Sequence, residues 1–139
     1  MQAPLIIADG HVHIHECFDF RRLLDRALNN FRREAGRPFL GLLFLTDIKP
    51  KGSFLTLQKE LTEKGGEQRL GPWTIQTTGE DLSLAAQITP EERLFLIAGR
   101  QLKTAEGLEV LALGTLGQLE EGYSLITMAQ KIILSGGLP

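Results

Sequence analysis

The stretch Ile6–Glu16, which reads IIADGHVHIHE, carries all three histidines of the chain. Successive side chains of a β-strand point to opposite faces, so the alternation predicts that Asp9 and the three histidines share one face. The first half of the stretch is apolar on both faces, as in a buried parallel strand covered by helices. Its polar residues gather at the C-terminal end, where open α/β sheets and barrels place their ligands.

The spacing of the histidines predicts a metal site. Residues at i and i+2 of a strand have Cα atoms roughly 7 Å apart, and two imidazoles there can converge on one ion at distances of about 2.1 Å. His11 and His13 are therefore the candidate metal ligands. His15 lies about 13 Å from His11 along an ideal strand, which makes it a ligand of a second metal, a substrate contact or a bystander. Asp9 is a candidate to accept a ring N–H or to bridge a metal.

Composition limits the class of protein. A chain of 139 residues that is 42% hydrophobic can bury one ordinary core, so we expect a single domain over residues 1–139. The formal charge is -2, with basic and acidic residues interspersed, which argues against nucleic-acid and membrane-surface partners. A single cysteine, Cys17, excludes an internal disulfide and indicates a reducing compartment. No apolar run approaches the roughly 18 residues of a membrane span, and no signal peptide is recognised, so we expect a cytoplasmic protein.

The segments that follow the histidines predict a βαβ unit. Asp19 is a plausible N-cap for an amphipathic helix that Gly36 ends. The apolar run at 39–47 predicts a second buried strand, which closes on Thr46-Asp47. Strand, helix and strand in this order indicate a right-handed parallel crossover. Ser53 is expected to cap a short second helix.

The second half of the chain has a different pattern. Alternation at 73–77 and 82–87 around turn residues predicts a β-hairpin. Apolar runs at 94–101 and 108–114 predict two further strands that pair antiparallel or lie side by side. The apolar face of 125–133 predicts a last helix.

Three motifs resemble the polymerase-and-histidinol-phosphatase (PHP) family. They are Asp9–His13 (DGHVH), the strand end Leu45–Asp47 (LTD), and Gly99–Gln101 (GRQ) leading into Leu108–Gly114 (LEVLALG). The histidines of the first motif match the family's Asp-x-His-x-His. The resemblance implies a distorted TIM-like (β/α)7 barrel that binds up to three divalent metal ions at the strand C-termini and hydrolyses phosphoesters.

The chain departs from the PHP pattern at three expected ligands. Ile48 stands where the family has a histidine, Gln101 where it has a glutamate, and Leu111 about where a later histidine falls. Glutamine lacks the anionic oxygen that hard divalent ions favour, and isoleucine and leucine cannot ligate. Two hypotheses therefore stay open: a metal-dependent phosphoesterase, or a non-catalytic binding or interaction module on the same scaffold.

The amidohydrolase superfamily is a second resemblance, because it too opens with a strand ending in His-x-His. It would imply hydrolysis of C–N bonds. Either family implies a divalent metal (zinc, manganese or iron) that activates water, and neither implies an organic cofactor here. The expected substrate is a small molecule, phosphorylated in the PHP interpretation.

The enzyme hypothesis gives each candidate residue a role. Asp9, Asp47 and His15 would be catalytic groups beside the metal ligands. Arg100 would clamp a phosphate, or else pair with Glu109 on the neighbouring strand. Lys49 and Lys51, on either side of Pro50, would attract an anionic substrate, or else form a solvated turn.

The resulting fold expectation is α/β: a partial (β/α) barrel of the PHP-like, TIM-like type, roughly its N-terminal half, with a β-hairpin insertion in the middle. A full barrel needs about 200 residues or more. We therefore expect either a fragment of a longer protein or a protomer that self-associates through an unpaired sheet edge.

Overall fold

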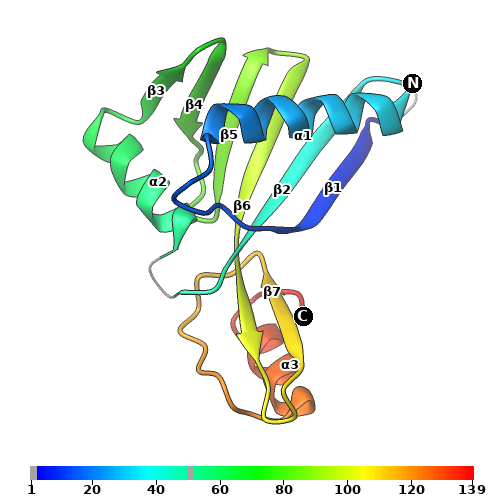
Figure 1. Ribbon diagram of the computed structural model, residues 1–139, viewed down its shortest axis with the longest axis vertical. Coiled ribbons are helices and arrows are strands. Elements are labelled where there is room, and N and C mark those ends of the chain that lie inside the picture. The colour runs from blue at the N-terminus through cyan, green and yellow to red at the C-terminus, as the bar shows by residue number, and fades with distance from the viewer. Residues whose placement is uncertain (1–2, 50–51) are drawn as a thin grey trace.

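Seven strands form one open mixed sheet in the computed structural model, which describes residues 3–49 and 52–139 (Figure 1). Three strands run parallel to one another: β1 (Leu5–Val12), β2 (Phe39–Asp47) and β6 (Glu92–Lys103). Three more continue the sheet antiparallel beyond β6: β5 (Ser83–Thr89), β4 (Trp73–Thr77) and β3 (Glu67–Leu70). The last strand, β7 (Glu109–Leu113), pairs with the second half of β6.

The predicted partial barrel is wrong. Strands outnumber helices seven to three in the described residues, and the sheet ends at β1 and β3 instead of closing. A parallel crossover needs a dozen or more residues, whereas a hairpin needs about two to five. The links on either side of β4 and β5 are of hairpin length, so the chain must reverse there. The predicted hairpin is confirmed as β4–β5, and β3 extends it.

Helix α1 (Phe20–Ala35) follows its sequence signals at both ends. The Asp19 carboxylate accepts a hydrogen bond from Arg22 N at 3.2 Å, as a helix N-cap does. Gly36 adopts a left-handed conformation with φ 60°, and its N–H donates to Arg32 O. Such a cap favours glycine, which has no Cβ to clash.

Helix α2 (Ser53–Glu63) starts in a different way from the one predicted. Ser53 is its first residue, and its N-cap is Gly52, which has no side chain to offer. The carboxylate of Asp47, at the end of β2, accepts from Ser53 Oγ at 2.6 Å and from Phe54 N at 3.1 Å. Asp47 thus takes the place of an N-cap side chain and satisfies one orphan N–H of the first turn, that of Phe54.

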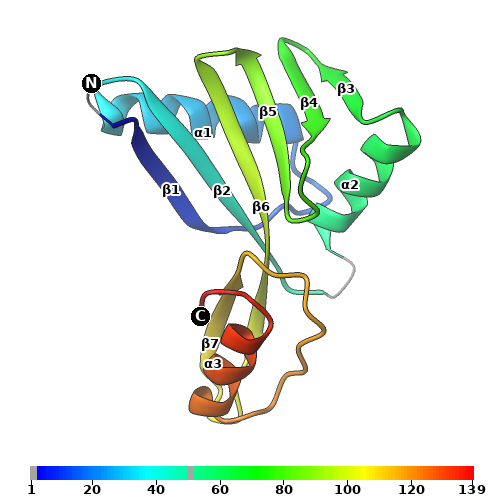
Figure 2. The same cartoon turned by 180° about the vertical axis from the view of Figure 1, so that it is seen from behind.

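Only one face of the parallel strands is covered by helices. Side chains of alternate residues, such as Leu43, Leu45 and Leu96, lie beneath α1 and α2 and are buried. The opposite face, here called the uncovered face, is also apolar: seen from behind, β1, β2 and the first half of β6 have no described helix in front of them (Figure 2). It consists of Ile6, Ala8, Leu40, Leu42, Phe44, Phe95 and Ile97.

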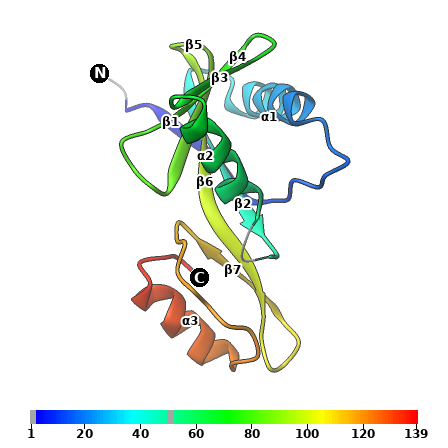
Figure 3. The ribbon, with the colours of Figure 1, turned by 90° about the vertical axis from the view of Figure 1, so that its left-hand side faces the viewer.

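Strand β6 serves two separate cores because it is long and twisted. Its first half contributes to the large core, whereas Leu102 joins a small one with Met128 and Ile132 of α3 (Leu125–Leu134). Figure 3 shows α1 and α3 on opposite sides of β6. Strands carry an intrinsic right-handed twist. The face of β6 that packs in the large core in its first half has therefore turned toward α3 at Leu102.

Ser124 is the N-cap of helix α3, and its hydroxyl accepts a hydrogen bond from Thr127 N at 3.3 Å. Hydrogen bonds from the Glu106 backbone, the Thr104 hydroxyl and the Leu125 N–H lower the pKa of the Glu106 carboxyl. This carboxylate therefore stabilises the folded state at neutral pH, and its contribution is lost as the pH falls through that lowered pKa. None of the helices in residues 3–49 and 52–139 combines the length and apolarity needed to cross a membrane.

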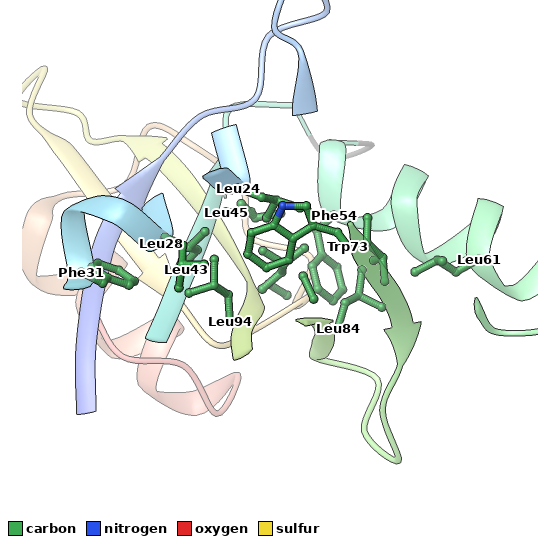
Figure 4. Packing of buried hydrophobic residues seen from close by; sticks show 14 residues of the cluster. Leu24, Leu28, Phe31, Leu43, Leu45, Phe54, Leu61, Trp73, Leu84 and Leu94 are labelled. Atoms are coloured by element: carbon green, nitrogen blue, oxygen red, sulfur yellow. The ribbon is translucent and has the colours of Figure 1, made fainter. Parts of the chain in front are cut away.

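Trp73 lies at the centre of the large core (Figure 4). It is fully buried, as is Phe54 of α2 to within 1%. Its indole Nε1 donates to Asp25 Oδ1 of α1 at 2.7 Å, so the polar atom of the ring is satisfied. Burial of an aromatic side chain removes roughly 150–250 Å² from water. Trp73 thus holds α1 and the hairpin side of the sheet together.

Candidate functional site

A β-bulge in β1 decides which way the histidines point. Asp9 pairs with Leu43 of β2 and Val12 pairs with Leu45, so β1 has one residue more than β2 over this interval. Both leucines lie on the helix-covered face, and Val12 packs with them. His11 and His13 therefore point to the uncovered side of the sheet. The predicted single face for Asp9 and the histidines is interrupted at this bulge.

Three side chains converge at the C-terminal end of β1. His11 Nε2 lies 2.9 Å from His13 Nε2 and 2.9 Å from Gln101 Oε1 of β6. The two imidazole rings are 4.8 Å apart at their centroids and meet edge to face. Gln101 reaches them because β6 extends past the ends of β1 and β2. We call this group the His–His–Gln cluster.

The cluster is a set of converging lone pairs. A neutral imidazole nitrogen carries at most one hydrogen, so His11 Nε2 can donate to His13 or to Gln101 but not to both. A cation would satisfy all three atoms at once. Two nitrogens 2.9 Å apart subtend about 87° at an ion if each bond is about 2.1 Å. Tetrahedral coordination with the same bonds puts the nitrogens about 3.4 Å apart, so a small movement of either ring would serve both geometries.

Asp9 and His15 make other contacts. Asp9 Oδ1 accepts from the backbone N–H of His11 at 3.1 Å, which holds the local turn of the chain rather than a ring. The His15 ring packs edge to face on Phe18 at 5.1 Å and lies 6.1 Å from the His13 ring. Both side chains are exposed. Neither belongs to the His–His–Gln cluster.

Asp47 is committed to the start of α2. Its two carboxylate oxygens accept from Ser53 Oγ and Phe54 N, as described above. By register it lies on the helix-covered face with Leu43 and Leu45, whereas the histidines of the cluster lie on the other face. Asp47 therefore supports the rim of the site from behind the sheet.

Arg100 and Gln101 are neighbours on β6 and point to opposite faces. Arg100 Nη1 donates to Leu119 O at 3.0 Å, away from the cluster. The alternative pairing with Glu109 is wrong, because Glu109 lies opposite Lys103 and Arg100 lies opposite Ala112. Lys51, the other predicted anion contact of the rim, lies outside the described residues.

The positions where the PHP pattern expects more ligands lie around the cluster. Leu111 of β7 pairs with Gln101, so it shares the face of the cluster. Ile48 is 55% exposed just beyond β2. Within residues 3–49 and 52–139, no group of three or more His, Cys, Asp or Glu side chains is arranged to hold a metal ion. The candidate ligand set is thus two imidazoles and one amide.

A cleft of about 720 Å³ opens between the segment after β1 and the start of α2, on the helix-covered side of the sheet. His13 and His15 line it from the β1 side, and Asp47 and Ile48 line it from the β2 side. Cys17 lies in its wall as a free, exposed thiol. The cleft is large enough for a small molecule, and His13 belongs to both the cleft and the cluster.

Comparison with protein-family models, curated proteins and solved structures found no match to this chain. The resemblances to the PHP family and to the amidohydrolases therefore stay predictions.

Sequence reasoning found two of the three residues of the cluster. The resemblance to the PHP family also points to position 101, but glutamine is a poor ligand, so the sequence does not predict Gln101 as one. The sequence signal for Gln101 is a polar residue at the end of a predicted strand, in a motif order that places this strand near β1. What the sequence did not show was that β6 is long enough to carry Gln101 to the histidines.

Proposed function

We propose that this chain is a metal-dependent, hydrolase-type domain in which the His–His–Gln cluster binds one divalent ion. The observation that carries the proposal is the 2.9 Å approach of His11 Nε2 to both His13 Nε2 and Gln101 Oε1. Two imidazoles and one amide oxygen suit zinc, manganese or iron.

The chemistry of such a site would be hydrolytic. A bound divalent ion lowers the pKa of a ligand water and polarises a phosphoryl or carbonyl oxygen. Three protein ligands on one side leave the remaining coordination positions for water and substrate. His13 connects the cluster to the cleft, and His15, exposed in the cleft wall, is placed to exchange protons with a substrate there.

The substrate class rests on the resemblance to the PHP family. It indicates a small phosphoester, whereas the amidohydrolase resemblance would indicate a C–N bond. The two differ in the substrate that is turned over, so a panel that contains both kinds distinguishes them. The single cysteine, exposed and unpaired, supports a reducing, cytoplasmic setting.

A non-catalytic binding module is the second candidate. Two observations favour it: Ile48 and Leu111 occupy expected ligand positions, and the Asp47 carboxylate is used to start α2. Under this proposal the cluster still binds metal or holds a single hydrogen bond from His11, but no turnover follows.

Metal titration tests the binding proposal. Isothermal titration of the purified chain with Mn²⁺, Fe²⁺ and Zn²⁺ should give one site per chain. His11→Ala and His13→Ala should each abolish it, while His15→Ala, the matched control, should leave the dissociation constant unchanged. No saturable binding of any of the three ions would overturn the proposal.

Turnover distinguishes the two candidates. The metal-loaded chain is assayed with aryl phosphate mono- and diesters and with amide substrates. Hydrolysis that His11→Ala abolishes and His15→Ala reduces supports the enzyme. Metal binding without hydrolysis of any member of the panel leaves the binding module.

Self-association is a further part of this proposal: a second copy of the chain would cover the uncovered face. Parallel sheets are normally covered on both faces, but here the uncovered face is apolar up to the free edge of β1. Among the described residues of β1, β2 and the first half of β6, the charged side chain on this face is Arg93, at the border, which lies over the Phe95 ring at 6.0 Å. Two such faces can meet without bringing like charges together, as a two-fold dimer requires.

A further inference from the structure

A second, smaller hollow lies behind the sheet from the His–His–Gln cluster. It has a volume of about 260 Å³ and lies between the end of β6, the loop after β2, the first turn of α2 and the segment 116–118. Its polar walls come from Lys49, Arg100, Asp47 and Gln118. We call it the Arg100 pocket.

The guanidinium of Arg100 is only partly satisfied. Nη1 donates to Leu119 O at 3.0 Å, whereas the buried Nε has no hydrogen-bond partner in the described part of the chain. A buried N–H of a charged group is normally paired, because water cannot reach it and desolvation is costly. Nη2 makes no hydrogen bond with a described residue either, and it is not buried, so it is the guanidinium donor that an incoming acceptor can reach.

The positive charge at this pocket exceeds the negative charge. Arg100 and Lys49 make no ion pair with a described residue. Asp47 lies opposite Arg100 in the β2–β6 register and keeps its negative charge, so the lining carries two positive charges and one negative charge. The first turn of α2, which carries the positive end of the helix dipole, faces the same hollow through Gly52, Phe54 and Leu55.

We infer that the Arg100 pocket binds a phosphate-class anion, either the free ion or the phosphate group of a small monoester. Arginine matches such oxyanions with two parallel N–H donors, and the α2 terminus and Lys49 add favourable charge. The inference stands apart from the metal proposal, because Arg100 and Gln101 point to opposite faces of β6. A phosphate here is a second ligand, in a pocket that shares Asp47, Lys49 and Gly52 with the cleft described above.

The test is phosphate binding by the intact chain, followed through the Arg100 side chain itself. Inorganic phosphate and methyl phosphate are titrated at constant ionic strength in the millimolar range, with chloride as the balancing salt. The Nε–H signal of Arg100 in ¹H–¹⁵N spectra should shift to saturation. Tighter binding of methyl phosphate than of phosphate would identify a monoester site, and the reverse order a site for the free ion.

Variants locate the binding. Arg100→Gln should weaken phosphate binding at least tenfold, and Lys49→Gln should weaken it less. Arg93→Gln removes the same charge from the same strand on the uncovered face and should leave the affinity unchanged. The proposal is overturned if the Arg100 signal does not shift in the wild-type chain, a readout that does not depend on how well Arg100→Gln folds. Equal weakening by Arg93→Gln would also overturn it, because the effect would then be one of net charge alone.

Discussion

Gln101 determines how strongly the His–His–Gln cluster can hold a cation. It supplies a neutral amide oxygen at the place where the resemblance to the PHP family puts a glutamate. The strand pairing and the 2.9 Å approach to His11 place that oxygen where a ligand would lie. The side chain thus lies in the right position but offers a weak metal ligand. A substitution that changes the ligand atom and keeps the shape therefore tests whether position 101 contacts the ion.

Gln101→Glu should tighten Mn²⁺ binding by roughly tenfold or more, because an anionic oxygen replaces a neutral one in the ligand set. Titration calorimetry measures the effect. Gln130→Glu adds the same charge on the exposed surface of α3 and is the matched control. A weaker affinity in Gln101→Glu would mean that position 101 does not face the ion.

The residue type of Asp47 suggested a catalytic role, whereas its contacts show a structural one. Its carboxylate completes the first turn of α2, and its surroundings leave it little freedom to turn. A Cβ added at Gly52 would come within 2.1 Å of Asp47 Cγ, so the loop fits closely around the carboxylate. The polar end of β2 and the resemblance of Leu45–Asp47 to a PHP motif both pointed to this residue.

At the scale of the element, the start of α2 depends on Asp47. Asp47→Ala should lower the free energy of unfolding by about 0.5–2 kcal/mol, the usual cost of losing an N-terminal helix cap. Denaturant unfolding measures the loss, and the metal dissociation constant should not change. Asp81→Ala removes an exposed carboxylate for which no hydrogen bond is found among the described residues, and it should be neutral. Lost metal binding at unchanged stability would instead make Asp47 part of the metal site.

The helices follow their local sequence signals more closely than the strands of the sheet do. The cap of α1 and its left-handed Gly36 are local devices, so sequence spacing identified them. The bulge of β1 is set by pairing with β2, because the extra residue is needed to keep Val12 in the core while β1 continues. Alternation alone cannot show it, and it reverses the side on which His11 lies.

At the scale of the molecule, the described helices cover β1, β2 and the first half of β6 on one face only. The uncovered face runs from the free edge of β1 to β6 and is apolar throughout. The exposed fraction of Ile6 on it is 58%. Exposed contiguous apolar surface of this kind marks association sites in soluble proteins.

The chain should therefore form a concentration-dependent dimer in solution. Light scattering coupled to gel filtration measures the mass. Ile6→Lys and Phe44→Gln, both on the uncovered face, should shift the equilibrium to monomer, because a dimer would bury an unpaired charge or an unsatisfied amide. Leu108→Lys, at an exposed leucine in the β6–β7 turn, is the control. A wild-type monomer at every concentration would contradict the prediction.

The sequence by itself determined the local features: the helices α1 and α3, the parallel pair β1–β2, the β4–β5 hairpin and the two histidines at a strand end. Each depends on periodicity, caps or turn residues within a short window. The tertiary structure alone decided that the sheet stays open, that Gln101 joins the histidines, and that Asp47 and Arg100 lie behind them. Those outcomes depend on strand order, on the length of β6 and on the β1 bulge, which arise from pairing between residues far apart in the chain.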